Sequence, residues 1–262
     1  MVLLQGKRAV IYGAGGAVGG AVARAFAREG ARVFLAGRTR TTLEAVADDI
    51  VAAGGVADVS PVNASDECAV QAQVDALFSE TNGLDVAFNA IGMDDVQGRP
   101  LVEMSLEEFL RPVATAARTQ FVTARCVARR MLQKRSGVLM TITAGPAREA
   151  TSHIGGFGAA CEAIEGLWRT LAAELGPHGI RVVCLRSAGS PDAPAVRDVF
   201  ALHAAAAGVS FDEYVATAGR GSLLGRLPAL AEVANAAVLL ASSHASALTG
   251  TFVNVTCGSR VD

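Results

Sequence analysis

The chain has 262 residues, of which 51% are apolar, and its net charge at pH 7 is −2. This length fits a single α/β domain, and the apolar fraction supplies a large core. The charge is balanced and forms no basic stripe, and no apolar run reaches the length of a membrane span, so nucleic acids and membranes are excluded as expected partners.

Short β-branched runs alternate with longer Ala/Leu-rich runs along the chain. The predicted strands are 7–12, 31–37, 54–60, 84–90, 137–143, 180–186 and 251–255. The predicted helices are 18–29, 41–53, 66–79, 106–132, 159–175 and 230–240. This alternation predicts one α/β domain over residues 1–262, a Rossmann fold whose doubly wound, seven-stranded parallel sheet has helices on both faces.

The segment 187–225 breaks this alternation. It is rich in Ala, Gly and Ser and precedes the last predicted helix. Long connections of this kind often cover a functional site. We therefore interpret it as an irregular insertion that forms a mobile lid.

A glycine-rich turn, YGAGGAVGG, joins the first predicted strand to the first predicted helix. Glycine backbone can approach a pyrophosphate closely, and the helix N-terminus behind it presents free N–H groups. We predict dinucleotide binding through Gly13, Gly15, Gly16, Val18 and Gly19. The alternative is a tight turn that only packs the helix on the sheet.

Arg38 follows the second predicted strand. A carboxylate at the end of that strand would bind the 2′-hydroxyl of NAD, but Gly37 stands there and leaves room. The guanidinium of Arg38 offers a fork of donors to a 2′-phosphate. The sequence therefore predicts NADP(H) rather than NAD(H) as the cofactor; the alternative is a solvated arginine.

These features resemble the short-chain dehydrogenase/reductase family from end to end of the chain. The family motif T-G-x-x-x-G-x-G is similar to residues 12–19, where Ala17 departs from the middle glycine, and N-N-A-G is similar to residues 88–92. LAAELGPHGIRV and LTGTFVNV are also typical. The resemblance implies an NAD(P)(H)-dependent oxidoreductase, with further cofactor contacts from Asn63, Asn89 and Ala90.

Family members move a proton with a tyrosine, a lysine, a serine and an asparagine. The corresponding positions carry Phe157, Cys161, Ala144 and Ala116, which we call the four tetrad positions. Phenylalanine has no ionisable proton and cysteine no fixed positive charge. The hydroxyl of Thr143 cannot substitute for a serine at 144, because adjacent strand residues face opposite sides. The resemblance and these residues together predict little or no ordinary carbonyl-reductase activity.

Two interpretations of Phe157 and Cys161 remain open at this point. They can fill the core, with Glu162 and Glu165 on the solvated side of the helix, or Cys161 can be a reactive thiol. The positions of the family's Pro-Gly and its nicotinamide-contacting Thr hold 187–189 (Ser-Ala-Gly) and Ala193, which weakens the nicotinamide end of the predicted site.

Several other residues are candidates for the missing acid–base chemistry. Asp94 and Asp95 follow the fourth predicted strand, at the edge where open α/β sheets bind ligands, and His153 precedes the fifth helix. We name Asp94 and His153 as weak substitutes for the missing tyrosine. The alternative for Asp94 is a turn cap or a solvent-facing residue, and the alternative for His153 is an exposed loop residue without a role. His178 is interpreted as structural, and the segment 187–225 adds Asp192, Asp212 and Glu213.

Three hypotheses of function follow. The first is a catalytically silent NADP(H)-binding protein, the second an oxidoreductase with substitute acid–base groups, and the third a non-redox cyclase, isomerase or dehydratase that reuses the pocket.

Small residues at 158, 159, 163 and 166 on the fifth helix suit helix pairing, and the resemblance implies a homotetramer or homodimer, or an assembly with an active relative. Scattered cysteines without metal-ligand spacing, and an N-terminal stretch too short for a signal peptide, predict a cytoplasmic protein without a bound metal.

Overall fold

The computed structural model describes residues 2–81 and 83–261. Its seven strands are β1 (Arg8–Tyr12), β2 (Arg32–Gly37), β3 (Val56–Pro61), β4 (Val86–Asn89), β5 (Gly137–Ala144), β6 (Ile180–Ser187) and β7 (Thr251–Val255). They pair in parallel in the order β3-β2-β1-β4-β5-β6-β7. The predicted doubly wound parallel sheet is therefore confirmed.

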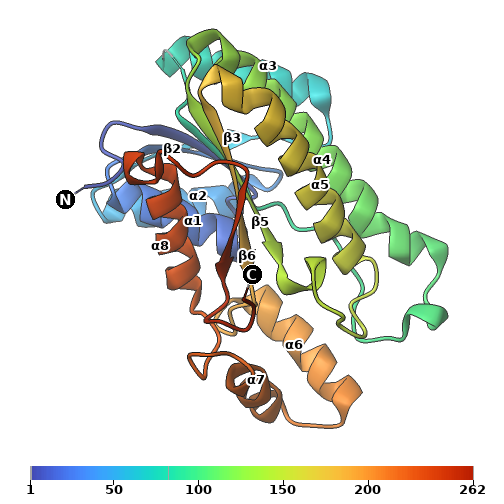
Figure 1. Ribbon diagram of the computed structural model, residues 1–262. Helices are drawn as coiled ribbons and strands as arrows, with labels where there is room; N and C mark the ends of the chain where they lie inside the picture. Colours follow the sequence, from blue (N-terminus) through green and yellow to red (C-terminus); the bar gives the residue numbers. More distant parts are fainter. Residues whose placement is uncertain (1, 82, 262) are drawn as a thin grey trace.

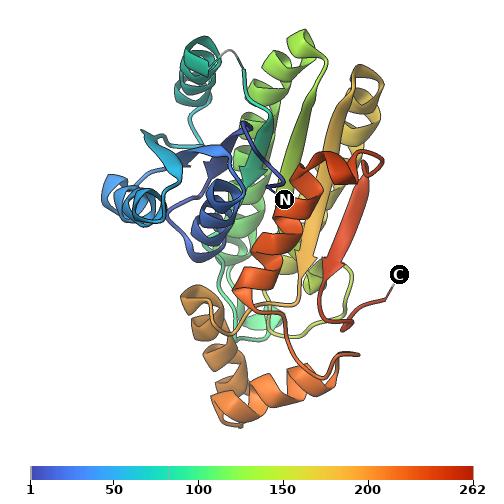
Figure 2. The same ribbon diagram turned by 90° about the vertical axis from the view of Figure 1, so that its left-hand side faces the viewer.

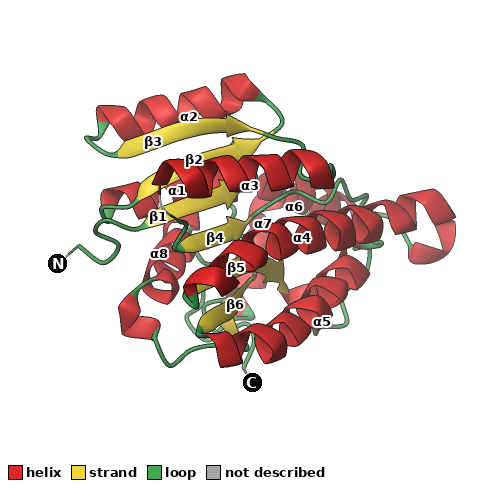
Figure 3. Ribbon diagram, turned by 90° about the horizontal axis from the view of Figure 1, so that it is seen from above, coloured by secondary structure: helices red, strands yellow, loops and turns green. Residues whose placement is uncertain are grey.

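Helices cover both faces of the sheet (Figures 1 and 3). The described helices are α1 (Ala17–Arg28), α2 (Arg40–Ala52), α3 (Glu67–Thr81), α4 (Leu106–Lys134), α5 (Phe157–Leu175), α6 (Pro194–Ala207), α7 (Phe211–Arg220) and α8 (Leu230–Ala241). One core cluster packs α1, α2 and α8 on the sheet, and the other packs α3, α4 and α5 on the opposite face. In β1, Ile11 faces the first cluster while Val10 and Tyr12 face the second, as strand alternation requires.

We predicted an irregular segment over residues 187–225, but the structure shows that it contains the two helices α6 and α7. Pro194 stands in the first turn of α6, Gly208 ends that helix at φ 70°, and the Ser210 hydroxyl caps α7 by accepting from the Glu213 N–H. These stop and start signals are present in the sequence, but the Ala-rich run between them has little amphipathic pattern. Figures 1 and 2 show both helices projecting from the body beyond the carboxyl ends of the strands.

None of the described helices combines the length and the apolar character needed to cross a membrane.

Candidate functional site

The turn between β1 and α1 is too tight for side chains at two of its glycines. Gly13 has φ 78°, and a Cβ there would lie 2.5 Å from the carbonyl oxygen of Ala90. A Cβ on Gly19 would lie 2.2 Å from the carbonyl oxygen of Gly13. Both glycines are therefore required by packing alone, and they bring the start of α1 against the residues that follow β4.

The N-terminus of α1 is where this turn can hold an anion. Gly16 is the N-cap, no side chain caps the helix, and its first turn carries no acidic residue. The first N–H groups of a helix have no intrahelical acceptor. A Cβ on Gly16 would approach only the Gly13 carbonyl, at 3.4 Å, so this part of the turn is open to a ligand. The N–H groups around Val18 are thus suited to a pyrophosphate.

Arg38 lies directly after β2 and is exposed. Within the described chain the structure records no ion pair or hydrogen bond for its guanidinium, whereas Arg40 pairs with Glu44 at 3.4 Å. Asn63 is also exposed, and its Oδ1 accepts from the Ser65 N–H in the turn after β3. Arg38 is therefore available to a ligand at the carboxyl ends of β2 and β3.

The side chain of Asn89 serves the protein interior. Its Nδ2 donates to the Thr123 hydroxyl at 2.9 Å, and its Oδ1 accepts from the Ile91 N–H at 3.1 Å. The Ala90 N–H donates to the Tyr12 carbonyl. Asn89 and Ala90 thus shape the turn after β4, and only their backbone is left to meet a cofactor.

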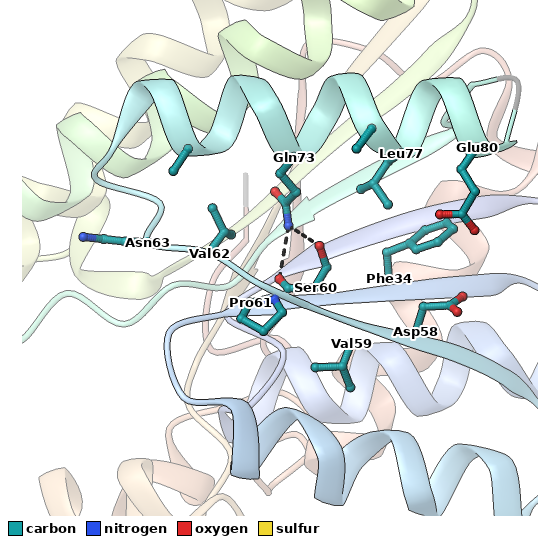
Figure 4. A pocket seen from close by; sticks show the side chains of 12 residues that line it. Phe34, Asp58, Val59, Ser60, Pro61, Val62, Asn63, Gln73, Leu77 and Glu80 are labelled. Carbon is teal, nitrogen blue, oxygen red and sulfur yellow. Dashed lines mark hydrogen bonds between the residues drawn. The ribbon is translucent and has the colours of Figure 1, made fainter.

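A groove of about 620 Å³ runs between β3 and α3. Figure 4 shows Asn63 at one end and Asp58 and Glu80 at the other, with Gln73 between them. Gln73 donates to the carbonyl and the hydroxyl of Ser60. None of the four tetrad positions lines this groove, so it is separate from the predicted reactive end.

The four tetrad positions hold only apolar or neutral side chains. Ala116 on α4 and Cys161 on α5 are buried, while Ala144 ends β5 and Phe157 begins α5, both half-buried. The backbone of Ala144 acts on the pKa of the Cys161 thiol, so these two positions lie close together. The only protonated group among the four is the buried Cys161 thiol, and none of the four is an ammonium.

Burial raises the pKa of the Cys161 thiol to about 12, against the opposing effect of the Ala144 N–H. The nearby carboxylates of Glu165, Asp95 and Glu162 raise it further. A thiol with this pKa is protonated at neutral pH and is a poor nucleophile. The structure therefore favours core filling over a reactive thiol at position 161.

Glu165 is not on the solvated side of α5 as predicted; its side chain is fully buried. Its carboxylate accepts from Arg186 in two hydrogen bonds, from Nε to Oε1 at 2.6 Å and from Nη2 to Oε2 at 2.8 Å. Thr143 and Arg148 each donate to it at 3.2 Å. Burial opposes the charge of Glu165, but these donors outweigh it and lower the pKa of the carboxyl. The Thr143 hydroxyl is thus occupied on the α5 face and does not serve position 144.

The two candidate carboxylates after β4 differ in their exposure and partners. Asp94 is highly exposed, at φ 55°, with Arg111 Nη1 3.8 Å from its Oδ2. Asp95 is half-buried, and its charge is felt by the Cys161 thiol. Its Oδ2 accepts from Gln97 Nε2 at 2.6 Å.

His153 serves the loop with its backbone, since its carbonyl accepts from the Gly98 N–H at 2.8 Å. A second histidine lies nearby that sequence reasoning missed. His203 on α6 is buried, and its Nε2 lies 2.8 Å from Gln97 Oε1. Burial lowers the pKa of His203, and the neighbouring His153 lowers it further. His203 is therefore neutral at pH 7 and donates to Gln97.

The other candidates have structural roles. Both carboxylate oxygens of Asp192 accept from the Leu230 N–H at the start of α8, and Asp212 and Glu213 lie in the first turn of α7. His178 lies 3.3 Å from Arg135, and Ala193 is buried. On α5, Gly158 packs against Ile154, whereas Ala159 and Ala163 are exposed.

The sequence contained one signal for the Glu165–Arg186 pair, which sequence analysis did not predict. Arg186 follows the apolar run VVCL of a predicted central strand, and a buried cation needs a partner. His203 and Gln97 gave no such signal, because they meet only through the folding of α6 onto the loop after β4. In the described residues, no group of three His, Cys, Asp or Glu side chains is arranged to hold a metal ion.

Comparison with known proteins gives one consistent picture. A family model described as enoyl-(acyl carrier protein) reductase matches residues 13–260. The uncharacterised oxidoreductase YxbG of Bacillus subtilis is 31% identical over 248 residues, which cover 94% of this chain and 88% of the relative.

Solved structures agree with the fold. NAD⁺-bound xylitol dehydrogenase superposes with a TM-score of 0.91 at 22% identity, covering 97% of this chain and 99% of that one. A protein of Beutenbergia cavernae, proposed to be an NAD(P)-dependent gluconate 5-dehydrogenase and crystallised with NADP at low occupancy, superposes with a TM-score of 0.86 at 28% identity over 98% of both chains.

Proposed function

Because the chain belongs to the short-chain dehydrogenase/reductase family, we propose that it binds NADP(H) and has little or no activity by the family's usual proton route. The observation that carries the proposal is an asymmetry between the two ends of one site. The uncapped N-terminus of α1 and the exposed guanidinium of Arg38 suit the phosphates, whereas the four tetrad positions offer no hydroxyl and no cation, only the buried thiol of Cys161.

The residues present fit the adenine and phosphate half of NADP(H). The α1 N–H groups around Gly16 and Val18 would hold the pyrophosphate, and Arg38 would hold the 2′-phosphate. When bound, the cofactor would supply a hydride donor or acceptor. Bound NADP in the Beutenbergia cavernae structure, at 28% identity, supports the choice of this dinucleotide.

The loss of the usual proton route has an estimable cost. A positioned general acid contributes roughly 10²–10⁴-fold to a rate. Loss of the tyrosine, lysine and serine functions together leaves binding and positioning alone. Ordinary enzymes turn over at about 1 s⁻¹ or faster. With NADPH and a panel of ketones, we expect this chain to turn over well below that rate. Turnover at or above that rate would contradict the proposal.

Restoring the four side chains provides the complementary test. The combined variant Phe157→Tyr, Cys161→Lys, Ala144→Ser and Ala116→Asn should gain measurable ketone reduction. The carboxylates of Glu165, Asp95 and Glu162 near position 161 favour an ammonium there. Because Ala116 is buried, the triple variant without Ala116→Asn serves as a control for misfolding.

A second candidate function is an oxidoreductase with a substitute acid–base group, and the half-buried Asp95 beside Cys161 is the observation that favours it.

For the assembly, we propose a homodimer or homotetramer, or pairing with an active relative. Exposed Ala159 and Ala163 on α5 and the exposed Phe121 on α4 support pairing through these helices. Light scattering that finds a monomer at micromolar concentration would contradict it.

A further inference from the structure

Three residues from two distant segments form one polar chain at the edge of the sheet. Gln97 in the loop after β4 donates from Nε2 to Asp95 Oδ2 at 2.6 Å and accepts at Oε1 from His203 Nε2 at 2.8 Å. The neutral imidazole can donate only if Nε2 carries the proton, and the Gln97 amide then has its NH₂ group toward Asp95. Each member of the chain therefore fixes the orientation of the next.

Apolar contacts hold the α6 end of this chain. The Tyr214 ring of α7 stacks on His203 with centroids 6.0 Å apart, and Phe200 meets Tyr214 edge-on at 5.5 Å. A Cβ on Gly98 would lie 3.2 Å from the Leu202 Cβ, so this loop and α6 are in close contact. The position of Asp95 thus depends on α6 being docked.

Asp95 has one oxygen that this chain leaves open. The structure records no hydrogen bond to its Oδ1 from any described residue, while Oδ2 is held by Gln97. The loop begins at Ala90, directly against Gly13 of the phosphate turn, and a Cβ on Gly155, two residues before Phe157, would lie 2.5 Å from the carbonyl oxygen of Val96 in the same loop. Asp95, next to Val96, therefore lies on the loop that joins the phosphate turn to the start of α5.

From this geometry we propose that Asp95 is the catalytic base of a slow alcohol oxidation, and that Gln97 and His203 are its positioning residues. The inference rests on the proposed NADP(H) binding. In the step, the alcohol O–H proton passes to the Asp95 carboxylate as the carbinol hydrogen leaves with its electron pair as hydride to NADP⁺. The C–O bond becomes C=O, NADPH forms, and protonated Asp95 returns its proton to solvent.

The charge of the nicotinamide ring allows a test that needs no substrate. NADP⁺ carries a positive ring and NADPH a neutral one, and the two share every other group. The Asp95 carboxylate, placed to take a proton beside that ring, would favour NADP⁺ by roughly tenfold or more. Calorimetric titration should therefore show that Asp95→Asn weakens NADP⁺ binding about tenfold relative to NADPH. Its neighbour provides the matched control, since Asp94→Asn should change that ratio less than about twofold.

Gln97→Leu should reduce the preference for NADP⁺ over NADPH by less than Asp95→Asn does, because it frees the Asp95 side chain without removing its charge. An unchanged ratio in Asp95→Asn would overturn the inference and leave cofactor binding intact. If the wild type binds neither form at millimolar concentration, the proposed function fails, and the inference with it.

Activity gives the second readout. With NADP⁺ and a panel of secondary alcohols at millimolar concentration, Asp95→Asn should lose about 10²-fold or more of the NADPH formed by the wild type, and Asp94→Asn should retain it. Equal rates in the two variants, or no NADPH formed by the wild type with any alcohol, would overturn the assignment.

Discussion

Glu165 and Arg186 form a buried, bidentate ion pair one helical turn beyond Cys161. The pair joins α5 to β6, and in its register Arg186 lies beside Thr143 of β5 and Asn254 of β7. The Arg186 guanidinium also lies over the Phe252 ring, 4.9 Å from its centroid. The helix that carries two of the tetrad positions is therefore fixed to the sheet by charge as well as by packing.

Removing one partner of this pair should be far more costly than removing both. Arg186→Met leaves the Glu165 carboxylate buried without its main partner, which typically costs about 3–5 kcal/mol. The double variant Arg186→Met/Glu165→Leu should recover most of that loss, since apolar replacements of buried pairs are often neutral or stabilising. Urea unfolding of the two variants measures the difference. A double variant as unstable as Arg186→Met would contradict this account of the pair.

Docking of α6 should weaken at mildly acid pH. Burial lowers the pKa of His203 below its unfolded value of about 6.5, so the docked state binds the proton less well. The free energy that favours docking of α6 is therefore greatest above about pH 6.5, and it falls as the pH drops below that value. The ionisable groups near His203 are His153, Tyr214 and, through Gln97, Asp95.

Hydrogen exchange over residues 194–220, corrected for intrinsic rates, checks this pH dependence. Exchange should be faster at pH 5.5 than at pH 7.5 in the wild type, and His203→Gln should remove most of the difference because its amide can still donate to Gln97. His178→Gln, remote from α6 in the turn after α5, is the control. Equal protection at the two pH values in the wild type would refute the prediction.

The Tyr12 hydroxyl is buried and has no hydrogen-bond partner among residues 2–81 and 83–261. Burial raises the pKa of Tyr12, so the group is a neutral phenol. A buried hydroxyl without a partner loses its hydration and gains nothing in return. Tyr12→Phe should therefore leave the free energy of unfolding unchanged or raise it by about 1 kcal/mol. A loss of more than about 1 kcal/mol would reveal a partner for the hydroxyl, such as a bound water.

Arg38 should distinguish the two dinucleotides. Arg38→Ala should weaken NADPH binding about tenfold or more and leave NADH binding within about twofold, because only NADPH carries the 2′-phosphate. Arg40→Ala is the matched control, since Arg40 is also exposed and already pairs with Glu44. Competition titrations with the two cofactors measure this, and parallel losses for NADPH and NADH would assign Arg38 a different role.

The sequence was sufficient for the sheet because its signals are local. Runs such as RVFLAG and the glycine turn before α1 predict strands and a turn without knowledge of their partners. The glycine at 13 is explained only by the structure, where Ala90, directly after β4, leaves no room for a side chain. The strand–turn–helix order alone was nevertheless enough to predict a phosphate site at this turn.

The reactive end could not be predicted in the same way. Its interactions join residues far apart in the chain, as Glu165 with Arg186 and Gln97 with His203 show. Helical spacing alone placed Glu165 on the outer face, because nothing local shows that β6 carries its partner. The neighbouring residues Asp94 and Asp95 are alike in sequence and differ only in the loop conformation that exposes one and holds the other.

Titration of the wild-type chain with NADPH tests the central claim most directly. The claim is that the phosphate half of the site persists although the tetrad positions have lost their chemistry. It predicts saturable binding well below millimolar NADPH, tighter than that of NADH. Absence of binding up to millimolar NADPH would contradict it.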